Sequence, residues 1–143
     1  MPIQVTDSLT IALQPEIYCV LKQAAGPSPT WDSFQGYDGS FFSVTRTSEE
    51  WSVICAQTVD NLALFSDAVE IETDFSLLKI LGKLDFGLVG VLAKFAQIFA
   101  NANIPIFCLS TFNTDYFLIK KEKLSEALTA LESHNIKWVD AHA

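Results

Sequence analysis

GLVGVLAKFAQIFANANIPIFCLSTFNTDYFLIKKEKLSEALTAL, residues 87–131, is the stretch that decides the fold. Its first part repeats apolar residues at steps of three and four, which is typical of one face of an amphipathic helix: Leu88, Val91, Leu92, Phe95, Phe99 and Ala102. Asp85 precedes this run at a position suited to capping, and Pro105 marks its far side. The pattern predicts a helix over about 88–102.

The flanking segments predict a ferredoxin-like arrangement. We expect a strand over 74–81 before the helix, and strands over about 106–112 and 115–120 after it. A second helix is expected over about 122–133, with Leu124, Ala127, Leu128 and Leu131 on one face, and a last strand over about 136–140. The order β-α-β-β-α-β predicts an α+β fold with an antiparallel sheet.

The N-terminal half contains a fainter copy of this pattern. After a shift of about 65 residues, FSVTRTSEEWSVI (42–54) aligns with FCLSTFNTDYFLI (107–119). The segment that aligns with the first helix contains Gly26, Pro27 and Pro29, which are incompatible with a regular helix. We therefore expect two ferredoxin-like (βαββαβ) units, at 1–66 and 67–143, of which the first lacks a regular first helix.

Charge and composition narrow the function classes. The chain has 143 residues, half of them hydrophobic, and a net charge of −8. Arg46 is its only arginine, so binding to nucleic acid or to an anionic membrane surface is disfavoured. We see neither an uninterrupted apolar run of transmembrane length nor a secretory signal. Cys19, Cys55 and Cys108 lie in apolar runs and read as buried, reduced thiols, which favours a cytoplasmic protein.

Polar residues interrupt the apolar runs between the two central strands: Ser110, Thr111, Asn113, Thr114 and Asp115. A hairpin tip explains them simply. The alternative is a ligand site, because Asp115 and Asp85 would face the same end of the sheet and could pair with an ammonium or another basic group. The loop GKLDFG (82–87) leaves the same choice open, between a simple strand-to-helix turn and a helix N-terminus that binds a carboxylate.

Enzymatic chemistry finds little support in the sequence. There is no nucleophile–base pair and no phosphate-binding loop beside the two carboxylates. His134 and His142 have no second ligand at metal spacing, and His134 is expected to contact the last carbonyls of its helix. We predict no cofactor, no metal and no catalytic residues.

Residues 87–131 resemble an ACT domain, a small regulatory module that binds amino acids. The specific features are Gly87 at the start of the helix and STF-x-TD between two strands. FFSVTRTSEEWSVICAQ (41–57) is similar to the first module of tandem-ACT proteins, which include the animal cytosolic arginine sensor and small bacterial relatives. The chain departs from that pattern because its first module is degraded.

The resemblance implies a ligand held between two ACT units. On one side it implies the loop before the first helix, with Gly82, Asp85, Phe86, Gly87 and Leu88, and the strand end, with Thr111, Phe112, Asn113 and Asp115. The opposite wall would come from Ile104, Pro105 and Ile106 of a neighbouring copy, so a complete site requires a homodimer. The expected function is a non-enzymatic, allosteric amino-acid sensor or regulatory protein whose ligand is zwitterionic or cationic. The alternative is an ACT-fold oligomerisation or protein-interaction module without a small-molecule ligand.

Overall fold

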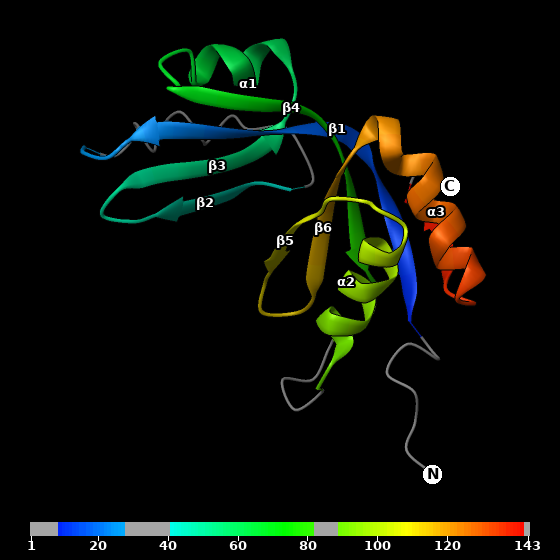
Figure 1. The fold of residues 1–143 in the computed structure, drawn as a ribbon. Coiled ribbons are helices and arrows are strands. Elements are labelled where there is room, and N and C mark those ends of the chain that lie inside the picture. The colour runs from blue at the N-terminus through cyan, green and yellow to red at the C-terminus, as the bar shows by residue number, and fades with distance from the viewer. Residues whose placement is uncertain (1–8, 28–40, 82–88, 142–143) are drawn as a thin grey trace. The chain divides into compact units, whose positions relative to one another are not determined.

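A computed structural model describes residues 9–27, 41–81 and 89–141 (Figure 1). Its elements are β1 (Thr10–Ala24), β2 (Ser43–Arg46), β3 (Glu50–Ala56), α1 (Val59–Leu64), β4 (Glu70–Ile80), α2 (Val91–Asn101), β5 (Phe107–Ser110), β6 (Asp115–Lys120), the 3-10 helix η2 (Lys121–Lys123), α3 (Leu124–Ser133) and β7 (Lys137–Asp140). From β4 to β7 this is the predicted β-α-β-β-α-β order, and the α+β class with a mainly antiparallel sheet is confirmed. None of the helices in the described part of the chain has the length and apolar character needed to cross a membrane.

The chain divides into two compact units. Residues 1–15 and 75–143 form one, here called the split unit, and residues 16–74 form the other, the inserted unit. The limits between the units divide two strands, so one part of β1 and one part of β4 belong to each unit. These limits come from contacts within the chain, and they differ from a boundary at 66/67. The division into two ferredoxin-like units at 1–66 and 67–143 stays a prediction.

In the split unit the strand order is β7-β1-β4-β6-β5. β4 and β6 are antiparallel, as are β5 and β6, whereas β1 and β7 are parallel with Ile11 opposite Trp138. The start of β1 thus lies between β7 and β4. The pairing of the start of β1 with β7 was not predicted, and it separates the first and last strands of the β-α-β-β-α-β unit.

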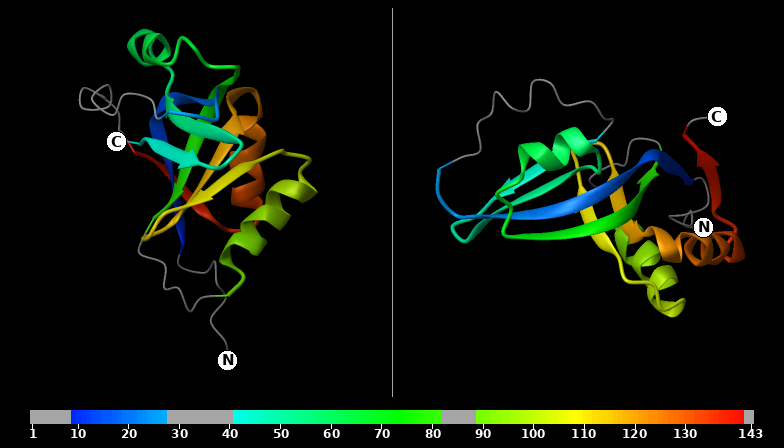
Figure 2. Two further views of the ribbon diagram at one scale, coloured as in Figure 1. Left: turned by 90° about the vertical axis from the view of Figure 1, so that its left-hand side faces the viewer. Right: turned by 90° about the horizontal axis from the view of Figure 1, so that it is seen from above.

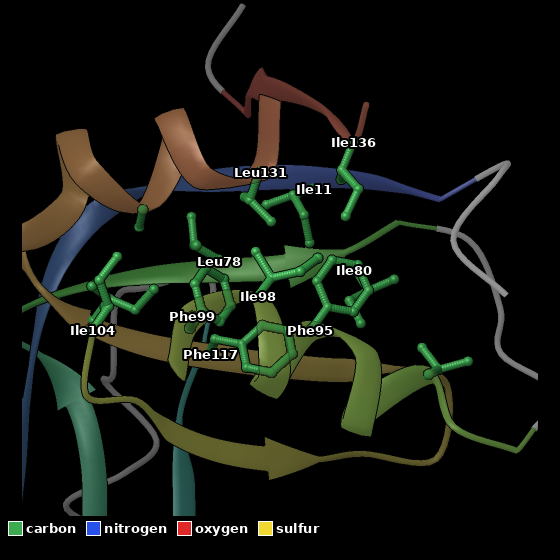
Figure 3. Close-up of a cluster of buried hydrophobic side chains, with 13 residues drawn as sticks. Ile11, Leu78, Ile80, Phe95, Ile98, Phe99, Ile104, Phe117, Leu131 and Ile136 are labelled. Atoms are coloured by element: carbon green, nitrogen blue, oxygen red, sulfur yellow. The ribbon is translucent and has the colours of Figure 1, made fainter. Parts of the chain in front are cut away.

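The core of the split unit lies between the sheet and two helices. α2 and α3 lie on the same face of the sheet (Figure 2). Their apolar side chains point toward β1, β4 and β6 (Figure 3); the largest fully buried members are Ile11, Leu78, Ile80, Phe95, Ile98, Phe99, Phe117 and Ile119. The predicted apolar face of α3 is confirmed, since Ala127 and Leu131 are fully buried. In α2 the buried face includes Ile98, while Leu92 is 38% exposed, so the predicted face was shifted.

Both helices of the split unit end in the same Asn-Ile motif. Asn103 and Asn135 each adopt a left-handed conformation, with φ of 60°. The next residue donates its N–H back to the helix, from Ile104 to Phe99 O and from Ile136 to Leu131 O, at 2.9 and 3.0 Å. This is the Schellman termination, in which the following apolar side chain packs against the last turn. Both isoleucines are accordingly buried.

The inserted unit has its own strand order and core. Its strands follow the order β2-β3-β1-β4, and its buried cluster comprises Cys19, Leu21, Val53, Cys55 and Phe65. α1 is a short helix capped by Thr58, whose hydroxyl accepts from the N–H of Asn61 at 3.0 Å. Most of the loop expected in place of a helix, residues 28–40, lies outside the described residues.

Candidate functional site

The polar interruption between β5 and β6 is a four-residue hairpin loop. The N–H of Thr111 donates to the carbonyl of Thr114 at 2.8 Å, and the Thr111 hydroxyl donates to the same oxygen at 3.2 Å. The loop exposes Thr111, Phe112 and Asn113, and Phe112 is 71% exposed. The hairpin prediction is therefore confirmed.

Thr114 attaches this loop to the neighbouring strand. Its side chain is 3% exposed, and its hydroxyl donates a 2.7 Å hydrogen bond to the carbonyl of Ile80, the last residue of β4. Residues 82–88 follow β4 and lead to α2. The loop of the hairpin and the start of α2 consequently lie at one end of the split unit (Figures 1 and 2). Our sequence-based site did not include Thr114, because a threonine in a turn gives no sign that its hydroxyl is buried.

Asp115 begins β6 on the face that α2 covers. It pairs with Ser110 across the hairpin, and its carboxylate accepts a hydrogen bond from the Ser110 hydroxyl. Residues two apart share a face, and Phe117 packs on Phe95 and Phe99 of α2, with ring centroids 5.5 Å apart in each pair. Asp115 is half-buried, so it offers a partly desolvated negative charge beside the exposed loop.

The negative charge of Asp115 affects the thiol of Cys108. The register of the hairpin puts Cys108 and Asp115 on the same face. Partial burial and then the negative charge of Asp115 raise the pKa of the Cys108 thiol. Cys108 itself is exposed, which corrects the prediction that all three cysteines are buried. The physical reason is that β5 ends the strand order, so the short apolar run Phe107–Leu109 belongs to an outer strand.

The predicted opposite wall lies at the other end of β5. Ile104, Pro105 and Ile106 connect α2 to β5, whereas the polar loop follows β5. Ile104 is 4% exposed and closes the last turn of α2, Pro105 is exposed and Ile106 is half-buried. The chain therefore does not bring these three residues to its own hairpin loop. Their role in a neighbouring copy stays a prediction.

The remaining predicted residues, Gly82, Asp85, Phe86, Gly87 and Leu88, lie outside the described residues. The structure does correct the start of the helix. Gly90 is the N-cap residue of α2, with a φ of 88° that favours glycine, and its carbonyl accepts from Lys94 N at 2.9 Å. The helix therefore starts at Val91, whereas we expected it at about residue 88.

Two further expectations concern metals and histidine. Across residues 9–27, 41–81 and 89–141, there is no group of three or more His, Cys, Asp or Glu side chains suited to hold a metal ion. Nδ1 of His134 lies 2.9 Å from the carbonyl of Ala130, so the predicted contact with the end of its helix is confirmed. A hollow at the turn between α3 and β7 is lined by Glu132, Asn135, Ile136, Lys137, Trp138 and Val139, none of which belongs to the predicted site.

Solved structures show the same fold. Protein Atu0741 from Agrobacterium tumefaciens is 23% identical, with a TM-score of 0.79 over 94% of this chain and 95% of that one. The ligand-free regulatory subunit of aspartate kinase from Thermus thermophilus is 13% identical, with a TM-score of 0.68 over 86% and 95%. The aspartate kinase of Clostridium acetobutylicum is 12% identical, with a TM-score of 0.64; the match covers 86% of this chain but 33% of that enzyme.

Sequence comparison gives the family of the C-terminal region. No match is found among curated proteins. Residues 70–133, from β4 to the end of α3, match the model of the ACT domain. The resemblance of this region to ACT domains is thus confirmed by the match of residues 70–133 to the ACT domain model.

Proposed function

We propose that this protein is a non-enzymatic sensor or regulatory protein that binds an amino acid. The observation that carries the proposal is the hydrogen bond from Thr114 to Ile80, which holds the polar hairpin loop at the end of β4 in a region of the ACT family. This end of the split unit contains the exposed Thr111 and Asn113 and the carboxylate of Asp115. Hydroxyl, amide and carboxylate groups suit the polar ends of an amino acid.

The charge of this end favours a zwitterionic or cationic ligand. The hairpin loop and the first residue of β6 include one carboxylate and no Lys or Arg. A partly desolvated carboxylate pairs well with an ammonium group, and Asp85 would add a second negative charge from the loop before α2. We assign the α-carboxylate of the ligand to the backbone of residues 82–88, where Gly82 and Gly87 would allow close approach.

A homodimer would complete the site. Ile104, Pro105 and Ile106 lie at the opposite end of β5 from the hairpin loop, so they are suited to reach a ligand bound by another copy. Pro105 is exposed and Ile106 half-buried, which leaves surface for such a contact. An allosteric effect would follow, because a ligand clamped between two copies stabilises the dimer geometry that binds it best.

A regulatory role without catalysis has support from the relatives. This chain covers 95% of the regulatory subunit of Thermus aspartate kinase but 33% of the whole Clostridium enzyme. A cytoplasmic setting fits three cysteines that are free thiols. The alternative function is an ACT-fold module for oligomerisation or protein interaction, which the exposed Phe112 at the hairpin loop also fits.

The test is a thermal-shift screen against the twenty amino acids, with the molar mass in solution measured by light scattering in parallel. A selective hit that also favours the dimer supports the sensor. A stable dimer that no amino acid shifts would support the oligomerisation module instead. If the protein stays monomeric with the amino acid bound, the site does not include Ile104, Pro105 and Ile106 of a neighbouring copy.

A further inference from the structure

Two buried cysteines face each other in the inserted unit. Cys19 of β1 and Cys55 of β3 are direct partners in the antiparallel register, and their Sγ atoms are 3.6 Å apart. Both side chains are fully buried, in the cluster with Leu21, Val53 and Phe65. They are separated by 36 positions in the sequence, so the contact depends on the fold of this unit.

The backbone geometry suits a disulfide between them. The N–H of Gln57 donates to the carbonyl of Ile17 at 2.7 Å, which marks these opposed residues as a hydrogen-bonded pair. Because the two kinds of pair alternate along an antiparallel ladder, Cys19 and Cys55 also form a hydrogen-bonded pair, with Cα atoms about 5.5 Å apart. Disulfides span Cα separations of about 4.4–6.8 Å. The Cα separation therefore lies within the disulfide range, and the two sulfur atoms must move from 3.6 Å to about 2.04 Å to form the bond.

We propose that Cys19 and Cys55 are a redox-active pair that a small hydroperoxide converts into a reversible disulfide within the folded protein. The contact with the Cys55 thiol lowers the pKa of Cys19 against the opposing effect of burial, and the contact with Cys19 raises the pKa of Cys55. Whichever thiol reacts first, the other lies 3.6 Å away and is placed to resolve the product.

The reaction balances with hydrogen peroxide as the oxidant. One cysteine sulfur attacks one peroxide oxygen, the O–O bond breaks, and a sulfenic acid and one water form. The other cysteine sulfur then attacks the sulfur of the sulfenic acid, the S–O bond breaks, and the hydroxyl leaves as a second water. The two thiols lose two electrons and two protons in total, and the peroxide is reduced. Complete burial of both thiols favours a small oxidant over a bulky disulfide.

The experiment uses the full chain with Cys108→Ser, which removes the exposed thiol and keeps the buried pair. The reduced protein is treated with hydrogen peroxide under native conditions, quenched with catalase, denatured and labelled with N-ethylmaleimide. We expect the intact mass to fall by two hydrogens, both cysteines to escape labelling, and peptide mapping to join Cys19 to Cys55. Dithiothreitol should restore both labels. Addition of oxygen without a crosslink, or full labelling of both thiols, would overturn the proposal.

Two further experiments test separately whether the oxidant reaches the buried thiols and whether the disulfide fits the folded unit. The same variant is refolded in a glutathione redox buffer. A disulfide that forms there but never in the native protein would assign the pair to folding, and would overturn the proposal of oxidation in the folded state. The oxidised native protein should melt several degrees higher than the reduced protein, because the bond closes a long loop. A lower midpoint would show that the bond distorts the unit, against the geometry argued here.

Discussion

The hydroxyl of Thr114 donates a 2.7 Å hydrogen bond to the carbonyl of Ile80, and both residues are buried. This bond links the β5–β6 hairpin loop to the end of β4. It therefore fixes the polar loop at the end of β4.

Replacing Thr114 with valine tests this link, since valine keeps the shape and removes the hydroxyl. The carbonyl of Ile80 would lose its partner in a buried place, at a cost of about 1–3 kcal/mol in the free energy of unfolding. Urea denaturation measures the loss. The matched control is Thr111→Val in the same loop, where the side chain is exposed and the expected cost is below about 1 kcal/mol. Equal losses in the two variants would contradict the anchoring role of Thr114.

Phe117 and Phe112 offer a second matched pair, because the first is buried and the second is exposed. Phe117 is fully buried against Phe95 and Phe99, so Phe117→Ala should cost about 3–5 kcal/mol of stability. Phe112 is 71% exposed, and Phe112→Ala should change stability by no more than about 0.5 kcal/mol. Thermal and urea unfolding of both variants check the difference. A large loss at Phe112 would mean that the loop packs against other parts of the protein.

Asn103, the left-handed residue after α2, predicts a specific pattern of stability changes on substitution. Asn103→Gly should be close to neutral, because glycine adopts a positive φ without strain. Asn103→Val should cost about 1–2 kcal/mol, since a β-branched side chain disfavours that conformation. The same pair of substitutions at Asn135 should repeat the result, as α3 ends in the same way. A neutral valine at both positions would argue against the Schellman termination.

The electrostatic effect of Asp115 on Cys108 predicts a pH effect on thiol reactivity. Burial and the carboxylate raise the pKa of Cys108 above the ordinary 9.0, so less thiolate is present at a given pH and alkylation by iodoacetamide is slow. Asp115→Asn removes the repulsive charge, so the alkylation profile should move to lower pH. The control Glu70→Gln removes an exposed charge on β4 and should leave the profile unchanged. Identical profiles in all three proteins would contradict the placement of Asp115 near the thiol.

The elements predicted well from the sequence are those with a complete local pattern. α3 and β6 lie where the periodicity placed them, because each carries its own apolar face and a clear limit at Lys120 or His134. The start of α2 was placed too early, because the apolar spacing already begins at Leu88, before Gly90. That spacing gives no sign that Gly90 adopts a left-handed conformation.

Features that depend on contacts between distant parts of the chain were not predicted from the sequence. The pairing of Thr10–Leu13 with β7 joins the two ends of the chain, and a short apolar run does not name its partner. Likewise the exposure of Cys108 depends on which strand ends the sheet, and the burial of Thr114 depends on where β4 stops. Within the candidate site, the sequence identified the hairpin loop. It could not identify the hydrogen bond that positions that loop.

The most direct measurement is a calorimetric titration of the amino acid that gives the largest thermal shift, with wild type, Asp115→Asn and Glu70→Gln. A ligand at 100 times its Kd adds about 2.7 kcal/mol to the stability of the native state, so a true ligand gives a clear thermal signal. We predict selective binding to wild type and Glu70→Gln, and a loss of at least about tenfold in affinity for Asp115→Asn, as expected when a charge-assisted hydrogen bond is removed. Equal affinity for all three proteins, or no binding by any amino acid, would contradict an amino-acid site at the hairpin loop.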